Sequence, residues 1–135
     1  MQEAAIQHRM HSEFSHAIDE ARVCIRLRAA RGDLAKVTLF CGDRACPATP
    51  VPMEAFPMEL AAQGEVADWF ELVFEPAWNR ICYYFLLEDK AGRTAWYFGD
   101  RFHDHPQVHR SEWYQIPIMN RHDLLPSRTD WQGQV

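Results

Sequence analysis

The stretch ICYYFLLEDKAGRTAWYF, residues 81–98, decides the fold class. It contains two runs rich in aromatic and aliphatic residues, 81–88 and 94–98, which flank the segment Asp89-Lys90-Ala91-Gly92. Asp and Gly are typical of tight turns, so the stretch predicts an antiparallel β-hairpin. Two apolar sets of side chains alternate along its first strand: Tyr83, Phe85 and Leu87, and Cys82, Tyr84 and Leu86. Because both faces are apolar, we expect one to lie in the core and the other to be covered by another subunit or domain.

Shorter segments with the same two-residue period lie on either side of this hairpin. They are residues 22–28, 36–41, 69–75 and 113–118. No amphipathic helix separates them, and serines interrupt the weak helical pattern of residues 10–21. The sequence therefore predicts an all-β fold, an antiparallel sandwich of about seven to eight short strands.

Prolines interrupt the chain between residues 44 and 64, which excludes a long helix there and leaves 51–60 as a short edge strand. Strand alternation also assigns a set of side chains to the space between the two sheets. These are Val23, Ile25, Leu27, Phe70, Leu72, Phe74, Tyr83, Phe85 and Leu87.

The end of the chain differs in composition from the rest. Residues 120–135 are polar, contain a proline and show no regular period, so we expect one domain, 1–119, followed by the start of a linker, 120–135. The net charge is -5 and the arginines are scattered, which argues against a nucleic-acid partner. Apolar runs are too short to span a membrane, and the residues from Met1 onward do not have the basic and apolar pattern expected of a secretory signal. These features predict a cytoplasmic protein without a membrane partner.

No motif concentrates catalytic groups: the sequence has no Gly-x-Ser-x-Gly elbow and no glycine-rich phosphate loop. His103, His105 and His109 have the spacing of possible zinc ligands, but no second ligand group stands out in the sequence. We expect a solvated loop there, with no metal and no cofactor. The alternative function is a free-standing metal-binding β-sandwich that uses the His103 to His109 cluster. The four cysteines are expected to be reduced and structural.

Several segments, in order, resemble the N-terminal domain of neopullulanases, cyclomaltodextrinases and maltogenic amylases. They are residues 5–9, 23–33 and 37–43, Trp69-Phe70-Glu71, residues 83–89, Trp96-Tyr97 and Phe102. The resemblance covers residues 4 to about 131. Each segment is weak evidence alone, but the ordered set is specific.

The resemblance implies an immunoglobulin-like sandwich known as a family-34 carbohydrate-binding module. In relatives it precedes a catalytic (β/α)-barrel that hydrolyses α-1,4 or α-1,6 bonds. The chain itself is then a non-catalytic part of a glycoside hydrolase of the alpha-amylase family. In many relatives the domain lies over the active site of the partner subunit and helps to form the dimer. Relatives often place an aromatic residue after the Gly-Asp pair, whereas Arg44-Ala45-Cys46-Pro47 follow Gly42-Asp43 here, so the resemblance does not carry that cleft-lining role over.

Aromatic side chains on a β surface are the remaining candidates for contact with sugar, because flat rings stack on the apolar faces of pyranoses. Trp96 and Tyr97 are adjacent in a strand, so one of them must face outward, and Phe102 follows directly. We predict that Trp96, Tyr97, Phe102 and Tyr84 contact a glucan or another domain. The expected partners are a weakly bound α-glucan or maltooligosaccharide and the catalytic barrel of the parent enzyme, in a partner subunit.

Overall fold

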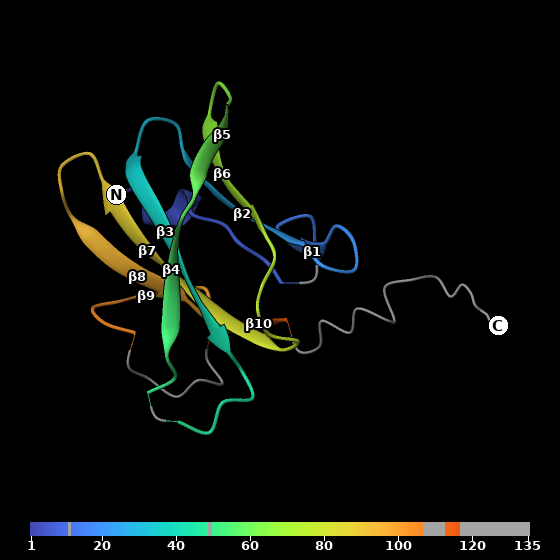
Figure 1. Cartoon of the computed structure of the whole chain (residues 1–135). Helices are drawn as coiled ribbons and strands as arrows, with labels where there is room; N and C mark the ends of the chain where they lie inside the picture. Colours follow the sequence, from blue (N-terminus) through green and yellow to red (C-terminus); the bar gives the residue numbers. More distant parts are fainter. Residues whose placement is uncertain (11, 49, 107–112, 117–135) are drawn as a thin grey trace.

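A computed structural model describes residues 1–135 except 11, 49, 107–112 and 117–135 (Figure 1). In the described part the chain forms ten strands and one 3-10 turn at Glu3–Ala5, arranged as two antiparallel sheets. We name these sheets A and B. Sheet A has the order β1 (Ser15–Ala17), β2 (Val23–Ala30), β6 (Ala67–Phe74) and β5 (Glu59–Gln63). Sheet B has the order β4 (Met53–Pro57), β3 (Leu34–Asp43), β7 (Ile81–Asp89), β8 (Thr94–Phe98) and β9 (Arg101–His103), and β10 (Tyr114–Ile116) also pairs with β7. The predicted all-β antiparallel sandwich is confirmed, with more strands than the seven to eight expected.

The hairpin on which the prediction was based is β7–β8, and its turn follows from its residue types. Phe85 pairs with Tyr97 and Leu86 with Trp96. The carboxylate of Asp89 accepts hydrogen bonds from the backbone N–H groups of residues 91 and 93, at 3.0 and 2.9 Å. Gly92 has a φ of 89°, which favours glycine because it lacks a Cβ. Asp and Gly therefore close the turn in the way that their sequence positions predicted.

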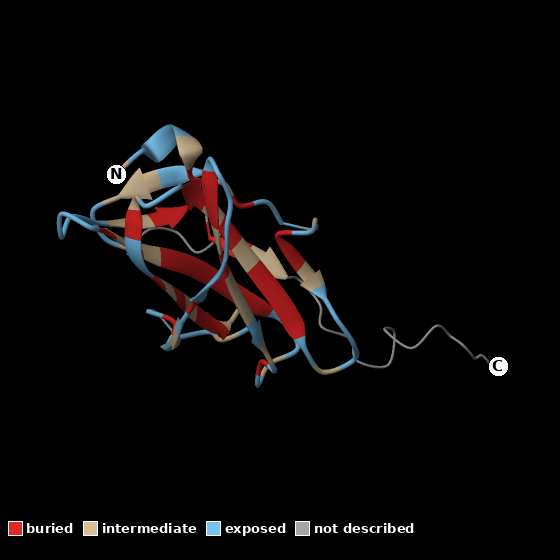
Figure 2. Ribbon diagram, turned by 90° about the horizontal axis from the view of Figure 1, so that it is seen from above, coloured by how far each residue is buried: buried red, intermediate tan, exposed pale blue. Residues whose placement is uncertain are grey.

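The core lies between the two sheets, and the alternation of the strands supplies it (Figure 2). Of the residues predicted to be inside, all but two are buried. Leu72 and Phe74 are half-buried instead, although both pack against the core cluster. They lie toward the end of β6, where Phe74 meets Phe56 of β4 with ring centroids 5.0 Å apart. Their inward direction was predicted correctly, and their degree of burial was not.

A buried polar cluster joins the N-terminal segment to this core. His8 is 2 % exposed, with Nδ1 2.7 Å from the carbonyl oxygen of Arg26 and Nε2 2.8 Å from the hydroxyl of Tyr83. The same hydroxyl lies 2.9 Å from Oγ of Ser15 in β1. Burial lowers the pKa of His8 from 6.5 to about 4. The imidazole is therefore neutral at neutral pH, and Nδ1 donates its hydrogen to the carbonyl group.

The edge strand expected over residues 51–60 is wrong in its extent, because this segment contributes to both sheets. β4 pairs with β3 in sheet B, and β5 pairs with β6 in sheet A. Met58, between them, is buried, and its N–H donates to the carbonyl of Val37 at 2.9 Å. Figure 1 shows β4 and β5 following one another along the front of the molecule. The crossing from one sheet to the other leaves no single continuous strand.

Residues 5–9, which carry part of the family resemblance, do not form a strand. The described structure of this opening segment is the 3-10 turn followed by one isolated bridge, in which Gln7 pairs with Arg28 of β2. Burial of Ile6 and His8 holds this segment against the sandwich. Of the last predicted strand, 113–118, β10 covers the centre, and residues 117–118 lie outside the described part of the chain, as does the predicted linker 120–135.

Candidate functional site

Aromatic side chains cover much of the outer face of sheet B, the face turned away from the core. Phe40 of β3 stacks on Tyr84 of β7, with ring centroids 5.6 Å apart. Trp96 of β8 meets both rings, 5.1 Å from Phe40 and 5.5 Å from Tyr84. Trp113 covers Tyr84 from the other side, 5.1 Å away. Alternation explains the arrangement, because Leu39, Phe85 and Tyr97, the neighbours of these residues in sequence, point into the core.

This face is closed at one end and open at the other. Tyr84 is 6 % exposed and Trp113 is 7 % exposed, and the indole N–H of Trp113 donates to the carbonyl of Pro106 at 3.2 Å. Burial raises the pKa of Tyr84 to about 12. Phe40 and Trp96 remain half-buried. A ligand or a protein surface can therefore reach the outer edge of the ring cluster but not Tyr84 itself.

The four predicted contact residues form two separate pairs. Trp96 and Tyr84 lie together on the outer face of sheet B. Tyr97 and Phe102 lie on its inner side, with ring centroids 4.9 Å apart, and Tyr97 is 4 % exposed. Strand alternation causes the separation, because Tyr97 pairs with Phe85 and with Phe102, both of which point inward. Trp96 is therefore the predicted residue that remains accessible on the outer face.

The histidine cluster is only partly described. His103 in β9 stacks on Phe98 with centroids 3.7 Å apart and an interplanar angle of 4°, and its Nε2 lies 3.2 Å from the carbonyl oxygen of Phe98. His105 is exposed, and His109 lies outside the described residues. Within the described residues, no three His, Cys, Asp or Glu side chains gather in a way that could hold a metal ion.

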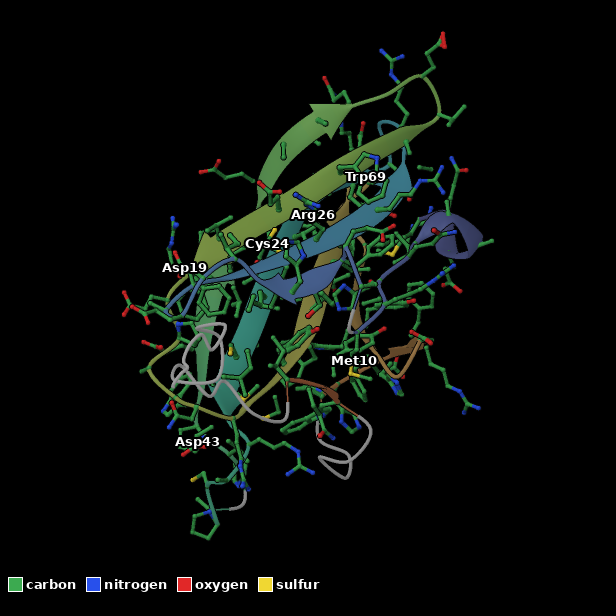
Figure 3. All side chains as sticks on the ribbon, turned by 90° about the vertical axis from the view of Figure 1, so that its right-hand side faces the viewer. Met10, Asp19, Cys24, Arg26, Asp43 and Trp69 are labelled. Atoms are coloured by element: carbon green, nitrogen blue, oxygen red, sulfur yellow. The ribbon has the colours of Figure 1, made fainter. Side chains whose placement is uncertain are left out.

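The outer face of sheet A has a different character (Figure 3). Trp69 of β6 is half-buried and packs against the ring of Phe14, with centroids 5.4 Å apart. The guanidinium carbon of Arg28 lies 6.0 Å from the centroid of the Trp69 ring. An open groove of about 400 Å³ runs beside them. It is lined by Gln7, Arg9, Glu13, Phe14, Arg28, Gly64, Val66, Ala67 and Trp69.

Next to this groove, polar side chains on the same sheet face already have partners. Nε of Arg26 donates to Oε2 of Glu71 at 2.7 Å, and the thiol of Cys24 lies 3.6 Å from the same oxygen. Hydrogen bonding to Arg26 lowers the pKa of Glu71. Figure 3 shows Cys24, Arg26 and Trp69 along this sheet.

Sequence reasoning missed Phe40, Trp113 and the groove beside Trp69. The position of Phe40 next to the inward-facing Leu39 was a usable signal, because alternation places Phe40 outside. The groove had no such signal, since one wall comes from the N-terminal segment before β1. That segment is held by the bridge from Gln7 to Arg28, by hydrogen bonds such as those of His8, and by buried side chains, rather than by a strand pattern.

Two further properties bear on the expectations from sequence. All four cysteines are present as thiols, and Cys24, Cys41 and Cys82 are buried, which raises the pKa of Cys41. Among the described residues, no helix is long and apolar enough to cross a membrane.

Comparison with known proteins gives consistent matches. The family model for the alpha amylase N-terminal ig-like domain matches residues 1–120. Neopullulanase 2 of Thermoactinomyces vulgaris is 29 % identical in an alignment of 126 positions that covers 84 % of this chain and 21 % of that protein. Cyclomaltodextrinase of a Bacillus species is 27 % identical over 121 residues, 90 % of this chain and 21 % of that protein.

Solved structures agree with the sequence matches. A cyclomaltodextrinase structure has a TM-score of 0.80 at 27 % identity and covers 92 % of this chain and 21 % of its own. The type III pullulan hydrolase of Thermococcus kodakarensis has a TM-score of 0.59 at 13 % identity, covers 82 % of this chain and 16 % of its own, and shows the shared fold alone. The chain thus spans about a fifth of the length of the curated relatives that it matches.

Proposed function

Because the chain belongs to the family of alpha-amylase N-terminal immunoglobulin-like domains, we propose that it assists dimer assembly and glucan contact in a longer enzyme that acts on α-glucans. The domain is the non-catalytic N-terminal part found in enzymes such as neopullulanase and cyclomaltodextrinase. In this proposal it is a carbohydrate-binding module of family 34, and residues 120–135 begin the linker to a catalytic barrel.

The observation that carries the assembly role is an open apolar patch on the outer face of sheet B. We name Thr38, Phe40, Leu86 and Trp96 the sheet B patch; all four are half-buried. Cross-strand pairing puts Thr38 beside Leu86 and Leu86 beside Trp96. A pyranose needs hydrogen-bonding groups around a stacking ring, and the patch offers only a hydroxyl and an indole N–H. Its chemistry fits the surface of another protein unit better than it fits a sugar.

The catalytic barrel is the proposed occupant of this patch. The matched relatives are almost five times as long as the matched region, so most of each enzyme lies outside the domain. Trp96 makes the central contact, and Tyr84 supports its ring from below, 5.5 Å away. Tyr97 and Phe102 do not contact the barrel in this proposal. They pack on each other on the inner side of the sheet, and this packing holds β8, which carries Trp96, against β9. Contact with a barrel in the partner subunit would make the same patch a dimer interface.

Light scattering on the full-length gene product tests the assembly role. The reading frame that follows Val135 is first determined, and it is expected to encode a (β/α)-barrel. Trp96→Glu places a charge in the centre of the patch and is expected to convert a dimer into monomers. Thr94→Ala, an exposed position of the same strand, is the matched control and should leave the dimer intact. A frame without a barrel, or a Trp96→Glu enzyme that remains dimeric, would contradict the proposal.

The cysteines support a cytoplasmic location, which is also a proposal. Thiols that are buried in strands, as Cys24, Cys41 and Cys82 are, contribute to packing and need no oxidising compartment. Fractionation of the native host with an antibody against the domain tests this, and recovery outside the cytoplasm would contradict it.

A further inference from the structure

We propose that the groove beside Trp69, on the outer face of sheet A, is a binding site for a short stretch of α-glucan. This inference rests on the proposed function, because it gives the glucan contact of the domain a location. It places sugar and protein on opposite sides of the sandwich, with the sheet B patch kept for the barrel.

The stacking platform of the site is held in place before any ligand arrives. Trp69 lies on the outer face because its neighbour Phe70 points into the core. Phe14, 5 % exposed, supports its ring at 5.4 Å with an interplanar angle of 31°. A ring that is already fixed loses little conformational entropy on binding, which favours affinity for a stacked pyranose.

The polar groups around the ring are suited to sugar hydroxyls. Gln7, Arg9, Glu13 and Arg28 line the groove and supply planar donors and acceptors. The side chains of Gln7, Arg9 and Glu13 make no hydrogen bond with another described residue. Arg28 lies over Trp69, so its guanidinium is held at the rim. These donors and acceptors can bind hydroxyl groups without first breaking an internal hydrogen bond.

Next to the groove, by comparison, the charged side chains of the same sheet face already have partners. Arg26 and Glu71, on the same face of the sheet, satisfy each other at 2.7 Å. In the groove, by contrast, the lining residues Arg9, Glu13 and Arg28 form no direct ion pair with one another among the described residues. The mixture of acidic, basic and amide groups gives the groove no strong excess of either charge. A neutral molecule with many hydroxyl groups fits it.

The tip of the β5–β6 hairpin forms the other wall. The N–H of Gly64 donates to the carbonyl of Ala67 at 2.7 Å, which closes the turn. Val66 in this turn is 74 % exposed, and together with Ala67 it lines the groove with apolar surface. One apolar wall opposite a polar wall matches a glucan chain, which has C–H faces and hydroxyl edges.

NMR of the ¹⁵N-labelled chain with maltoheptaose tests the site. Each indole N–H gives its own signal, and Trp→Phe variants assign the signals. Adding maltoheptaose should shift the Trp69 signal in a saturable way and leave the Trp113 signal unchanged. Inorganic phosphate at the same concentration should shift neither.

Variants separate binding from folding. Trp69→Ala is expected to weaken maltoheptaose binding at least tenfold; because it removes a ring from Phe14, a second variant is needed. Glu13→Ala changes an exposed side chain, should retain the wild-type spectrum, and is expected to weaken binding severalfold. Lys36→Ala, exposed on sheet B, is the matched control and should bind as the wild type does.

The outcomes distinguish this inference from the proposed function. A shift of the Trp96 signal with no change at Trp69 would overturn the site and keep glucan contact as a function of the domain. No shift of any indole signal would overturn the site and the glucan contact together, while the dimer role depends on light scattering alone. Equal binding by wild type and Glu13→Ala, or a larger response to phosphate, would also overturn the site.

Discussion

The outer faces of the two sheets show how one sequence pattern produces two kinds of surface. On sheet B the outward rings pack on one another, as Tyr84 does between Phe40 and Trp113. On sheet A the outward ring of Trp69 packs on a single ring among the described residues, that of Phe14, and faces an open groove with Arg28 at its rim. A two-residue period puts an aromatic side chain outside in both cases. Its neighbours then decide whether that side chain is a packing element or a binding platform.

The difference originates in the described side chains that come from outside each sheet's strands. Trp113 lies against Tyr84 on the outer face of sheet B, and its indole N–H donates to the carbonyl of Pro106. The N-terminal segment instead approaches sheet A at its edge, where Gln7 bridges to Arg28 and leaves the Trp69 groove open. The closed face should therefore be important for stability and the open face for binding.

The largest predicted effect is on the closed face. Trp113→Ala removes a ring that is 7 % exposed and uncovers Tyr84, so we expect a loss of about 3–5 kcal/mol in the free energy of unfolding. Trp69→Ala should cost less than half as much, because Trp69 is only half-buried. Urea unfolding followed by circular dichroism measures both. Equal losses would break the distinction between the two faces.

Acid should weaken the core that both faces share. The unfolded chain protonates His8 as the pH falls through about 6.5, whereas the folded chain resists until about pH 4. The free energy of unfolding should therefore fall between these values, and the His8 contribution to that fall should be about 3 kcal/mol. Unfolding curves at a series of pH values measure it. His8→Gln should show a smaller fall over the same range, and identical pH profiles would contradict the role assigned to His8.

The close packing of residues 52–53 on β3 can be tested at Gly42. A Cβ at this position would lie 2.5 Å from the sulfur of Met53 and 2.6 Å from the carbonyl oxygen of Pro52. Gly42→Ala should therefore cost about 1–3 kcal/mol through overpacking. Differential scanning calorimetry would record this as a lower melting temperature. An unchanged melting temperature would show that residues 52–53 are not packed tightly on β3.

The smallest effect is expected at the ion pair on sheet A. Arg26 and Glu71 are 35 % and 31 % exposed, so solvent screens their attraction. Glu71→Gln should cost less than about 1 kcal/mol, and the difference should shrink further at high salt. Urea unfolding at low and high ionic strength measures both values. A loss comparable with that of Trp113→Ala would mean that sheet A also has a closed, structural face.

Much of the fold could be predicted because local patterns specify it. The β7–β8 hairpin, the inward set of Val23, Ile25 and Leu27, and the outward position of Tyr84 follow from alternation and turn chemistry. The division of residues 51–60 between two sheets could not be predicted from these local patterns. It depends on which strands are available for pairing on each side of Met58, which is a property of the assembled sandwich.

The candidate site was harder to predict, because exposure depends on contacts that are distant in sequence. Alternation gave the direction of Tyr84 correctly but could not reveal that Trp113 covers it. The same limit applies to Trp69, whose groove is completed by residues more than fifty positions earlier in the chain: Gln7, Arg9, Glu13 and Phe14. Sequence predicted which way the side chains point, and tertiary packing determined which of them a ligand can reach.

Hydroxyl-radical footprinting of the tryptophans tests the contrast between the faces most directly. Mass spectrometry measures the oxidation rate of each ring in the isolated chain, in the chain with maltoheptaose, and in the full-length enzyme. We predict that Trp69 and Trp96 react in the isolated chain and that Trp113 is protected. Maltoheptaose should then protect Trp69 alone, and the full-length enzyme should protect Trp96. Rapid oxidation of Trp113, or protection of Trp96 by the sugar with Trp69 unaffected, would contradict the assignment of one face to packing and protein contact and the other to glucan.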